Sequence, residues 1–453
     1  MKSKGIYIFI SNPYRKKVEF NVKCCKGKYA YGGENMLKSY NELTDIQQEN
    51  VNYYLDQADG HRLNYLHKDF GVIRGRSNAV FRENIIHGLM METIPFPDFL
   101  QWLSHVHLEG NNTFFVYEPI EEKCLNKIED LDKMYTKTKE KITPLYDINK
   151  DHLNEIKLVD VKKDGQKNQL IFTIAAPAQV QVKRVESGQY ELRKHVYLAY
   201  FIVDFDLRSI ILLMHPTQGL ASIYGEIRKR EIDEVTWIIL HYFTENILKF
   251  TLKEPEWIVS ALAKISEEYF YHNNPIIEDK KENFSESLIS ELLLTLQEFD
   301  PTLKREDTLL RLERGLESLY ESELIVIHKR IEKDLSFNIF LQQADRGATQ
   351  FKANTRGKAL GHAEAGEFIR LMWENGDIFN VGLIHIESGK EYPYIVKKTD
   401  KYYSFKKYNT SVTEKEVVDN VLRKLNEYKQ NVETPTDFSG VEEIGYRTND
   451  SQA

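Results

Sequence analysis

The amino-acid sequence predicts a multidomain α+β protein in which antiparallel sheets and helices occupy separate parts of the chain. β-branched and aromatic residues gather in short runs between residues 169 and 214, with turn residues between the runs, which is typical of antiparallel strands. Helical stretches precede and follow this region without the regular strand–helix alternation of a doubly wound sheet. The length of 453 residues suggests two or three domains, because single cores seldom grow beyond about 300 residues.

The first part of the chain, residues 1–120, is expected to form an N-terminal α+β domain. The turn Asn12-Pro13 separates two strand-like runs, and Pro97 suits the first turn of a helix. Residues 121–155 are rich in lysine and poor in large apolar side chains, which predicts a charged helical linker. The elements expected here are strands at 5–10, 18–24 and 113–117 and helices at 41–57, 77–91 and 97–107.

Residues 156–275 are expected to form an antiparallel sheet with helices after it, and residues 284–430 a helical segment followed by a C-terminal ββαββ-like domain. The end, 431–453, is polar and is expected to be a disordered tail. The expected strands lie at 169–174, 179–185, 190–204, 209–214, 336–342, 348–353, 378–386, 392–398 and 402–406, and the helices at 232–248, 255–271, 285–299, 307–333, 363–374 and 414–429.

Composition excludes several classes of protein. Aromatic residues make up 12% of the chain, which excludes disorder for its bulk. No apolar run is long enough to cross a bilayer or to act as a signal-peptide core, so we expect a soluble cytoplasmic protein with no membrane partner. The only cysteines are Cys24, Cys25 and Cys124, which predicts no disulfide framework. The chain is rich in Lys, Ile, Asn, Glu and Tyr, which is typical of proteins from AT-rich genomes. This composition suggests a bacterial protein, from a mobile element or an antiviral (phage) defence locus.

No complete catalytic or metal-binding motif is present. The sequence lacks the glycine-rich phosphate loop of P-loop enzymes and the Gly-x-Gly-x-x-Gly fingerprint of dinucleotide binding. It also has no Cys/His set with the spacing of a zinc site. We therefore expect no cofactor and no bound metal.

Arg82-Glu-Asn-Ile-Ile-His87 resembles the catalytic motif of HEPN-type ribonucleases. The resemblance implies that the histidine and arginine act on the scissile phosphate, one in proton transfer and the other on developing charge. Glu83 stands where that family usually has another polar group, and Asn84 is a partial substitute. The alternative interpretation is an arginine on a helix surface and a histidine near a helix end.

Three further sets of polar residues have both a metal-site and a structural interpretation. His105 and His107, with Glu109 beyond them, would converge on zinc only from a strand, and the apolar spacing before them favours the end of a helix. Asp204 and Asp206 could share a divalent ion, but aspartate at this point is typical of a hairpin turn. The third set resembles, with the wrong spacing, the active site of metal-dependent nucleases and also fits a hairpin: Asp377, His385, Glu387 and Lys390.

The loop from residue 346 to residue 358 is basic in a chain whose net charge is −8. It has no acidic residue, and it precedes a predicted helix that starts near His362. Backbone N–H groups at a helix start, flanked by basic side chains, are typical of a phosphate site. The expected contacts to nucleic acid or phosphate are Arg346, Lys352, Arg356 and Lys358. A weaker basic cluster comprises Lys183, Arg184, Arg193, Lys194 and His195.

Taken together, these patterns favour a non-catalytic binding or accessory protein. We expect it to engage nucleic acid or a phosphorylated ligand locally and weakly through the basic loop, and to contact a protein partner that the sequence does not identify. One alternative is a HEPN-like ribonuclease that uses Arg82 and His87. The other is a structural protein–protein scaffold built on the helices of residues 285–333.

Overall fold

The computed structural model describes residues 39–120, 125, 128–184, 188–229, 231–270, 274–282, 286–303, 305–328, 335–346, 349–356, 360, 377–409 and 414–433. The expected strands at 5–10 and 18–24, the three cysteines, the helix at 363–374 and residues 434–453 of the expected tail lie outside these residues. Residues 431–433, where a disordered tail was expected to begin, are helical instead. No helix in the described ranges combines the length and apolar character needed to cross a membrane.

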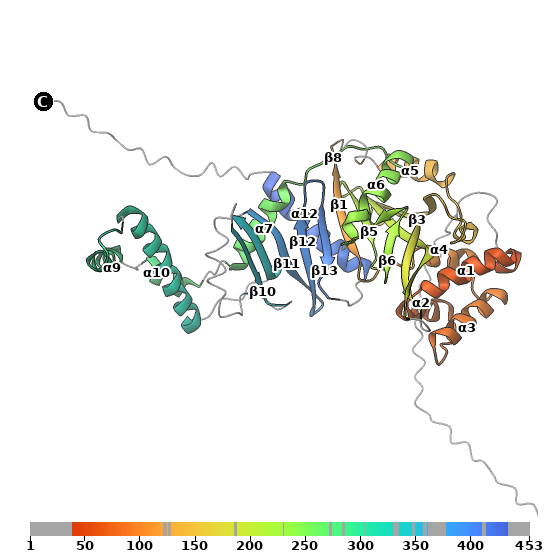
Figure 1. The fold of residues 1–453 in the computed structure, drawn as a ribbon, viewed down its shortest axis with the longest axis horizontal. Helices are drawn as coiled ribbons and strands as arrows, with labels where there is room; N and C mark the ends of the chain where they lie inside the picture. Colours follow the sequence, from red (N-terminus) through yellow and green to blue (C-terminus); the bar gives the residue numbers. More distant parts are fainter. Residues whose placement is uncertain are drawn as a thin grey trace, which may run out of the picture.

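The described residues form a mixed α+β structure around one large antiparallel sheet (Figure 1). The helices are α1 (Asp45–Gln57), α2 (Gly60–Phe70), α3 (Asn78–Met90), α4 (Phe96–Ser104), α5 (Ile128–Lys139), α6 (Thr236–Asn246), α7 (Trp257–Phe270), α8 (Pro275–Glu282), α9 (Glu286–Phe299), α10 (Arg305–His328) and α12 (Lys415–Glu433). The strands are β1 (Thr113–Pro119), β2 (Lys157–Asp164), β3 (Gln169–Lys183), β4 (Tyr190–Asp204), β5 (Ser209–Met214), β6 (Leu220–Ile223), β7 (Glu226–Ile227), β8 (Leu252–Lys253), β9 (Asn338–Arg346), β10 (Thr349–Asn354), β11 (Asp377–Glu387), β12 (Lys390–Lys398) and β13 (Tyr403–Lys407).

The sheet runs in the order β10-β9-β11-β12-β13-β1-β5-β4-β3-β6-β7, with β2 paired to β3 and β8 to β1. Strand β1 lies between the two halves. Phe114 is opposite Phe405 of β13 on one side and opposite Leu213 of β5 on the other. A strand from the N-terminal segment thus joins the middle and C-terminal strands into one sheet. The division into domains at the expected boundaries stays a prediction.

Helices cover both faces of the central strands. Buried side chains of α1 to α4, α7 and α12 pack on one face, and those of α6 with Leu131 of α5 pack on the other. The first eight residues of β3 are all buried, which explains their continuous apolar run, since a strand covered on both faces has no polar side. The far end of β3 instead alternates between exposed and half-buried residues.

Local sequence signals explain where several helices begin. The side chain of Thr44 accepts the backbone N–H of Gln47, and the Gln47 side chain accepts the backbone N–H of Thr44. This capping box satisfies two donors that the first turn of α1 leaves free. Pro97 lies in the first turn of α4, where a proline costs no hydrogen bond, as the sequence predicts.

Candidate nucleic-acid interface and neighbouring sites

The basic loop belongs to the hairpin at one edge of the sheet. Lys352 lies on β10 opposite Gln343 of β9, and its side chain is exposed. Arg356 follows β10, is exposed and has a φ of 56°. Its N–H donates to Oδ1 of Asn354 over 2.7 Å, an arrangement typical of a turn.

Only part of the predicted phosphate site can be followed. Arg346 is the last residue of β9, whereas Lys358 and the expected helix start near His362 lie outside the described residues. The structure therefore places Arg346, Lys352 and Arg356 on the same edge hairpin, but the strand register puts the positions of Arg346 and Lys352 on opposite faces of the sheet. The contact predicted for Lys358 and the expected helix start stay predictions.

The register of the strands aligns Lys352 with residues that the sequence analysis did not select. Lys352 is opposite Gln343, Gln343 is opposite Asn380 of β11, and Asn380 is opposite Lys397 of β12. Residues paired in this way point to the same face of a sheet. The Asn380 amide confirms it, because Nδ2 donates to Oε1 of Gln343 over 3.1 Å.

A third lysine lies on the same face. Lys406 of β13 is opposite Ile395, two residues before Lys397 on β12. Lys352, Lys397 and Lys406 are all exposed, and none of the ion pairs among the described residues involves them. Lys398, by contrast, pairs with Glu254 over 2.5 Å. Only the strand pairing reveals this set, since the three lysines are scattered along the sequence.

Three acidic positions share the orientation of these lysines: Asp345 of β9, which is opposite Gln350, Asp377 of β11, which is opposite Asp345, and Glu391 at the far end of β12. Glu391 is opposite Ile386, and this position has the same orientation as Lys397 along β12. Six residues of strand separate Glu391 from Lys397, which is about 20 Å at the usual rise of a strand. The Glu391 carboxylate is therefore too far away to neutralise Lys397.

Arg82 and His87 both line a groove of about 490 Å³ beside α1 and α3. The Arg82 guanidinium donates to the backbone oxygens of Leu55, Asp56 and Ala58, at 2.9 to 3.2 Å. These carbonyls lie at the end of α1, where a helix leaves carbonyl groups without intrahelical partners, although the Leu55 oxygen also accepts the backbone N–H of Ala58 over 3.1 Å. The Asp56 carboxylate lies 3.7 Å from the same guanidinium. In this structure the arginine holds the end of α1, and His87 is exposed.

His105 and His107 lie just after α4, which ends at Ser104, in agreement with the helix-end interpretation. His105 Nδ1 is 2.8 Å from the Gln101 carbonyl oxygen, and Nε2 is 3.5 Å from Oδ2 of the buried Asp160. Burial lowers the pKa of His105 to about 4 and raises the pKa of Asp160 to about 7. Glu109 pairs with Arg62 of α2.

His107 stacks on His215, with ring centroids 4.1 Å apart, and His215 stacks in turn on Tyr197. Burial lowers the pKa of His107 to about 3, and the nearby Arg62 lowers it further. Burial also holds the pKa of His215 well below its usual value. These rings are therefore neutral at physiological pH.

Asp204 and Asp206 occupy the turn between β4 and β5. Oδ1 of Asp204 accepts the backbone N–H groups of Asp206 and Leu207 at 3.0 and 2.8 Å. Oδ2 of Asp204 accepts from Gln169, and Asp206 accepts from Asn168. Both carboxylates thus stabilise the hairpin, as the turn interpretation predicts.

The nuclease-like set is spread along one hairpin. Asp377 begins β11 and Glu387 ends it, so the strand separates the two carboxylates. Glu387 is opposite Lys390 across the turn, His385 Nε2 lies 3.3 Å from Oε2 of Glu387, and Asn420 of α12 donates to Oε1. The turn residues Ser388 and Gly389 both have positive φ, which is typical of a two-residue hairpin.

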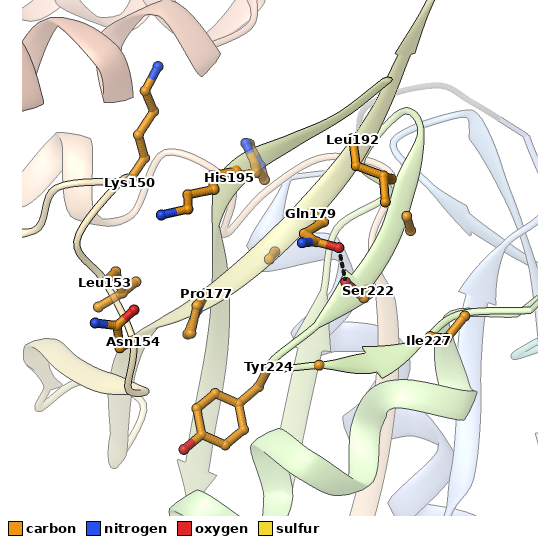
Figure 2. A pocket seen from close by; sticks show the side chains of 14 residues that line it. Lys150, Leu153, Asn154, Pro177, Gln179, Leu192, His195, Ser222, Tyr224 and Ile227 are labelled. Carbon is orange, nitrogen blue, oxygen red and sulfur yellow. Dashed lines mark hydrogen bonds between the residues drawn. The ribbon is translucent and has the colours of Figure 1, made fainter. Parts of the chain in front are cut away.

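Four residues of the weaker basic cluster form two groups, and the fifth, Lys183, is the last residue of β3. Arg184 and Arg193 both pair with Glu191. Lys194 and His195 instead line a pocket of about 600 Å³ beside β3, β4 and β6, shown in Figure 2. The sequence does not distinguish these two groups. The pocket also contains residues from the loop after α5 and from the β6–β7 hairpin, which are distant from the cluster in the sequence.

Within the described ranges, no three His, Cys, Asp or Glu side chains gather in a way that could hold a metal ion. No protein-family model matches the chain, and no curated protein and no solved structure matches it either. The site must therefore be interpreted from its own geometry.

Proposed function

We propose that this chain is a non-catalytic binding protein that holds nucleic acid on the exposed face of β9 to β13 and on the hairpin that ends at Arg356. The observation that carries the proposal is the set of exposed lysines on one face, Lys352, Lys397 and Lys406, without an acidic partner among the described residues. Lysine contacts to phosphates release counterions and supply most of the affinity of nucleic-acid binding that does not depend on sequence.

The spacing of the lysines favours an extended polyanion over a single phosphate. Neighbouring strands lie about 4.8 Å apart, so Lys352 and Lys397, three strands apart, are about 14 Å from each other. Lys397 and Lys406 are diagonal neighbours at roughly 7–8 Å. A backbone with many phosphates can contact all three.

The net charge of −8 supports a local and weak interaction. Acidic surface elsewhere repels a polyanion, so binding is confined to this face and depends strongly on salt. The cytoplasmic location and the phage-defence setting stay predictions.

The test is a salt titration of binding to single-stranded RNA and DNA of twenty nucleotides. Three lysine contacts predict that log affinity falls with log salt at a slope of about −2, and Arg356 extends it to about −3, since each contact on a single strand contributes about −0.7. The variant Lys352→Ala/Lys397→Ala/Lys406→Ala should flatten the slope by about 2 and leave the thermal unfolding temperature nearly unchanged, because exposed substitutions rarely affect stability.

A matched control removes the same charge elsewhere. Lys68, Lys133 and Lys137 are exposed on α2 and α5, so Lys68→Ala/Lys133→Ala/Lys137→Ala should keep the slope of the unmodified chain. Equal slopes for both triple variants, or no binding at low salt, would contradict the proposal.

One observation favours the scaffold alternative. The helices α9 and α10 lie apart from the sheet in Figure 1 and expose large apolar side chains: Phe299 is 84% exposed and Val326 73%. Apolar surface of this kind is typical of protein contacts. The scaffold and its partner stay a prediction, which light scattering of the purified protein would test through its oligomeric state.

A further inference from the structure

The hairpin between β6 and β7 holds a tyrosine in an unusual backbone conformation. Ile223 is opposite Glu226, so Tyr224 and Gly225 form the two-residue turn. Their φ angles are 47° and 83°. This turn normally carries Asn-Gly, because a side chain as bulky as tyrosine is strained at positive φ. A strained residue persists where the surroundings hold it, and such positions cluster at binding sites.

The strain at Tyr224 brings an aromatic ring to the wall of the pocket in Figure 2. The N–H of Tyr224 donates to the Pro177 carbonyl over 2.7 Å, which anchors the turn on β3. Two more large apolar side chains line the pocket and face solvent: Leu192 is 59% exposed and Ile227 72%. The lining of the pocket therefore includes an aromatic ring and apolar side chains that the protein itself leaves uncovered.

The opposite end of the pocket is cationic. Lys150 and Lys194 line it together with His195 (Figure 2). Lys194 Nζ donates to the backbone oxygen of Asp151 over 2.7 Å, and Lys150 Nζ lies 5.2 Å from the centre of the Tyr53 ring. These contacts position both ammonium groups without neutralising them. None of the described residues that line the pocket is acidic.

His195 adds an uncharged donor to the lining of the pocket. Its Nδ1 is 3.0 Å from the Tyr53 hydroxyl oxygen, which also accepts the Val196 N–H. We therefore assign the hydroxyl proton to the bond with Nδ1, which leaves the proton of the neutral ring on Nε2. Burial and the nearby Lys150 lower the pKa of His195 to about 4, so the ring stays neutral.

We propose that this pocket binds a nucleoside phosphate, with the base against Tyr224 and the phosphate between Lys150 and Lys194. The volume of about 600 Å³ lies within the range of small-ligand sites, which combine apolar walls with a few polar groups. Asn154 and Gln179 supply amides for the edge of a base. The site is independent of the basic face, because β6 and β10 lie toward opposite ends of the sheet.

The first experiment is calorimetric titration of the full chain with each of the four ribonucleoside 5′-monophosphates. We expect at least one to bind one per chain, with its nucleoside and inorganic phosphate each at least about tenfold weaker, since hydrogen bonds to a charged group contribute that much. The proposal is overturned if none of the four binds at millimolar concentration, or if the nucleoside or phosphate alone binds as tightly as the nucleotide.

The second experiment uses Tyr224→Asn, which restores the residue that the turn prefers. The variant should unfold at an equal or higher temperature while its affinity for the nucleotide falls at least about fivefold, the lower range of base–aromatic stacking. A lower affinity therefore cannot be attributed to a damaged fold. An unchanged affinity for the nucleotide would contradict the proposal that its base lies against Tyr224.

The phosphate end is tested with Lys150→Ala/Lys194→Ala, expected to weaken nucleotide binding at least about tenfold. Lys133→Ala/Lys137→Ala removes the same charge from α5 and should bind normally. The triple variant of the basic face should also keep its nucleotide affinity, so this proposal and the proposed function can fail separately. Equal affinities for the two double variants would overturn the assignment.

Discussion

Arg82 shows that a residue selected by a short sequence motif can be engaged in hydrogen bonds within the folded chain. A motif specifies residue types and spacing, but not the carbonyl groups that the folded chain brings within reach. The end of α1 presents the backbone oxygens of Leu55, Asp56 and Ala58, and the guanidinium of Arg82 donates to all three. The arginine that would act on a scissile phosphate is thus engaged within the protein.

This arrangement predicts opposite behaviour for the two motif residues. Arg82→Ala removes donors from three carbonyls and should lower the free energy of unfolding by about 1–3 kcal/mol. His87→Ala changes an exposed position and should shift it by less than about 0.5 kcal/mol. Urea unfolding of both variants checks this. RNA cleavage by the purified chain that disappears in both variants, with Arg82→Ala as stable as the original, would instead support the ribonuclease alternative.

At the scale of elements, one carboxylate connects the C-terminal helix to the middle of the chain. Asp419 of α12 is buried, and its Oδ2 accepts from Lys415 and from Lys167, both at 2.7 Å. Lys415 also donates to the side chain of Gln169 at the start of β3 over 2.6 Å. Burial lowers the pKa of Lys415, and the negative charge of Asp419 partly offsets this decrease.

Removing this carboxylate leaves two partly buried ammonium groups without their partner. Asp419→Ala should therefore lower the free energy of unfolding by about 3–5 kcal/mol, the usual cost of breaking a buried ion pair from one side. Lys167→Met removes only one of the two cations and should cost clearly less. Denaturant unfolding at neutral pH measures the free energy of unfolding of both variants. An equal decrease in the two would contradict the prediction that losing Asp419 costs more because it leaves both lysines without their partner.

The sequence predicted elements where the pattern was strong and local. Strands β4, β5 and β9 to β13 lie within a few residues of their expected ranges, because β-branched runs and turn residues mark them. The two strands expected at 169–174 and 179–185 are instead one continuous strand, β3. Helix α2 was not predicted, since Gly60 and two histidines obscure its apolar side, although Leu63 and Leu66 are fully buried. Strand β2 was also missed, because lysine and aspartate make up most of its residues.

At the scale of the whole molecule, the missing information is the pairing of distant strands. Val116 of β1 lies opposite Tyr403 of β13 and opposite Ile211 of β5. A period-two pattern indicates that a segment is a strand but not which strands flank it. The set of exposed lysines, Lys352, Lys397 and Lys406, and the pocket in Figure 2 both arise from such long-range pairings. The sequence could therefore suggest the edge hairpin and His195, but neither complete site.

Four half-buried histidines with lowered pKa values, His105, His107, His195 and His215, give the whole molecule a specific sensitivity to acid. The pKa of His107 lies at about 3 and those of His105 and His195 at about 4, and that of His215 is also well below its usual value of 6.5. The unfolded chain binds a proton on each ring near pH 6.5, whereas the folded chain does not until the pH is far lower. Their contribution to stability is therefore complete above pH 6.5 and is lost as the pH falls toward 4.

Asp160 acts in the opposite direction, because its raised pKa of about 7 makes the folded chain hold a proton that the unfolded chain has lost.

His107→Phe tests this dependence, because phenylalanine keeps a ring against His215 but has no proton to bind. Each of these histidines reduces the free energy of unfolding by about 1.4 kcal/mol per pH unit within its window. Between pH 6 and pH 4.5 the variant should therefore lose stability less steeply than the unmodified chain, by about 1.4 kcal/mol per pH unit. Urea unfolding at several pH values gives both slopes, and the contribution of Asp160 cancels because both proteins contain it. His215→Phe should flatten the slope in the same way, whereas parallel slopes would mean that these rings already bind protons in the folded chain at pH 6.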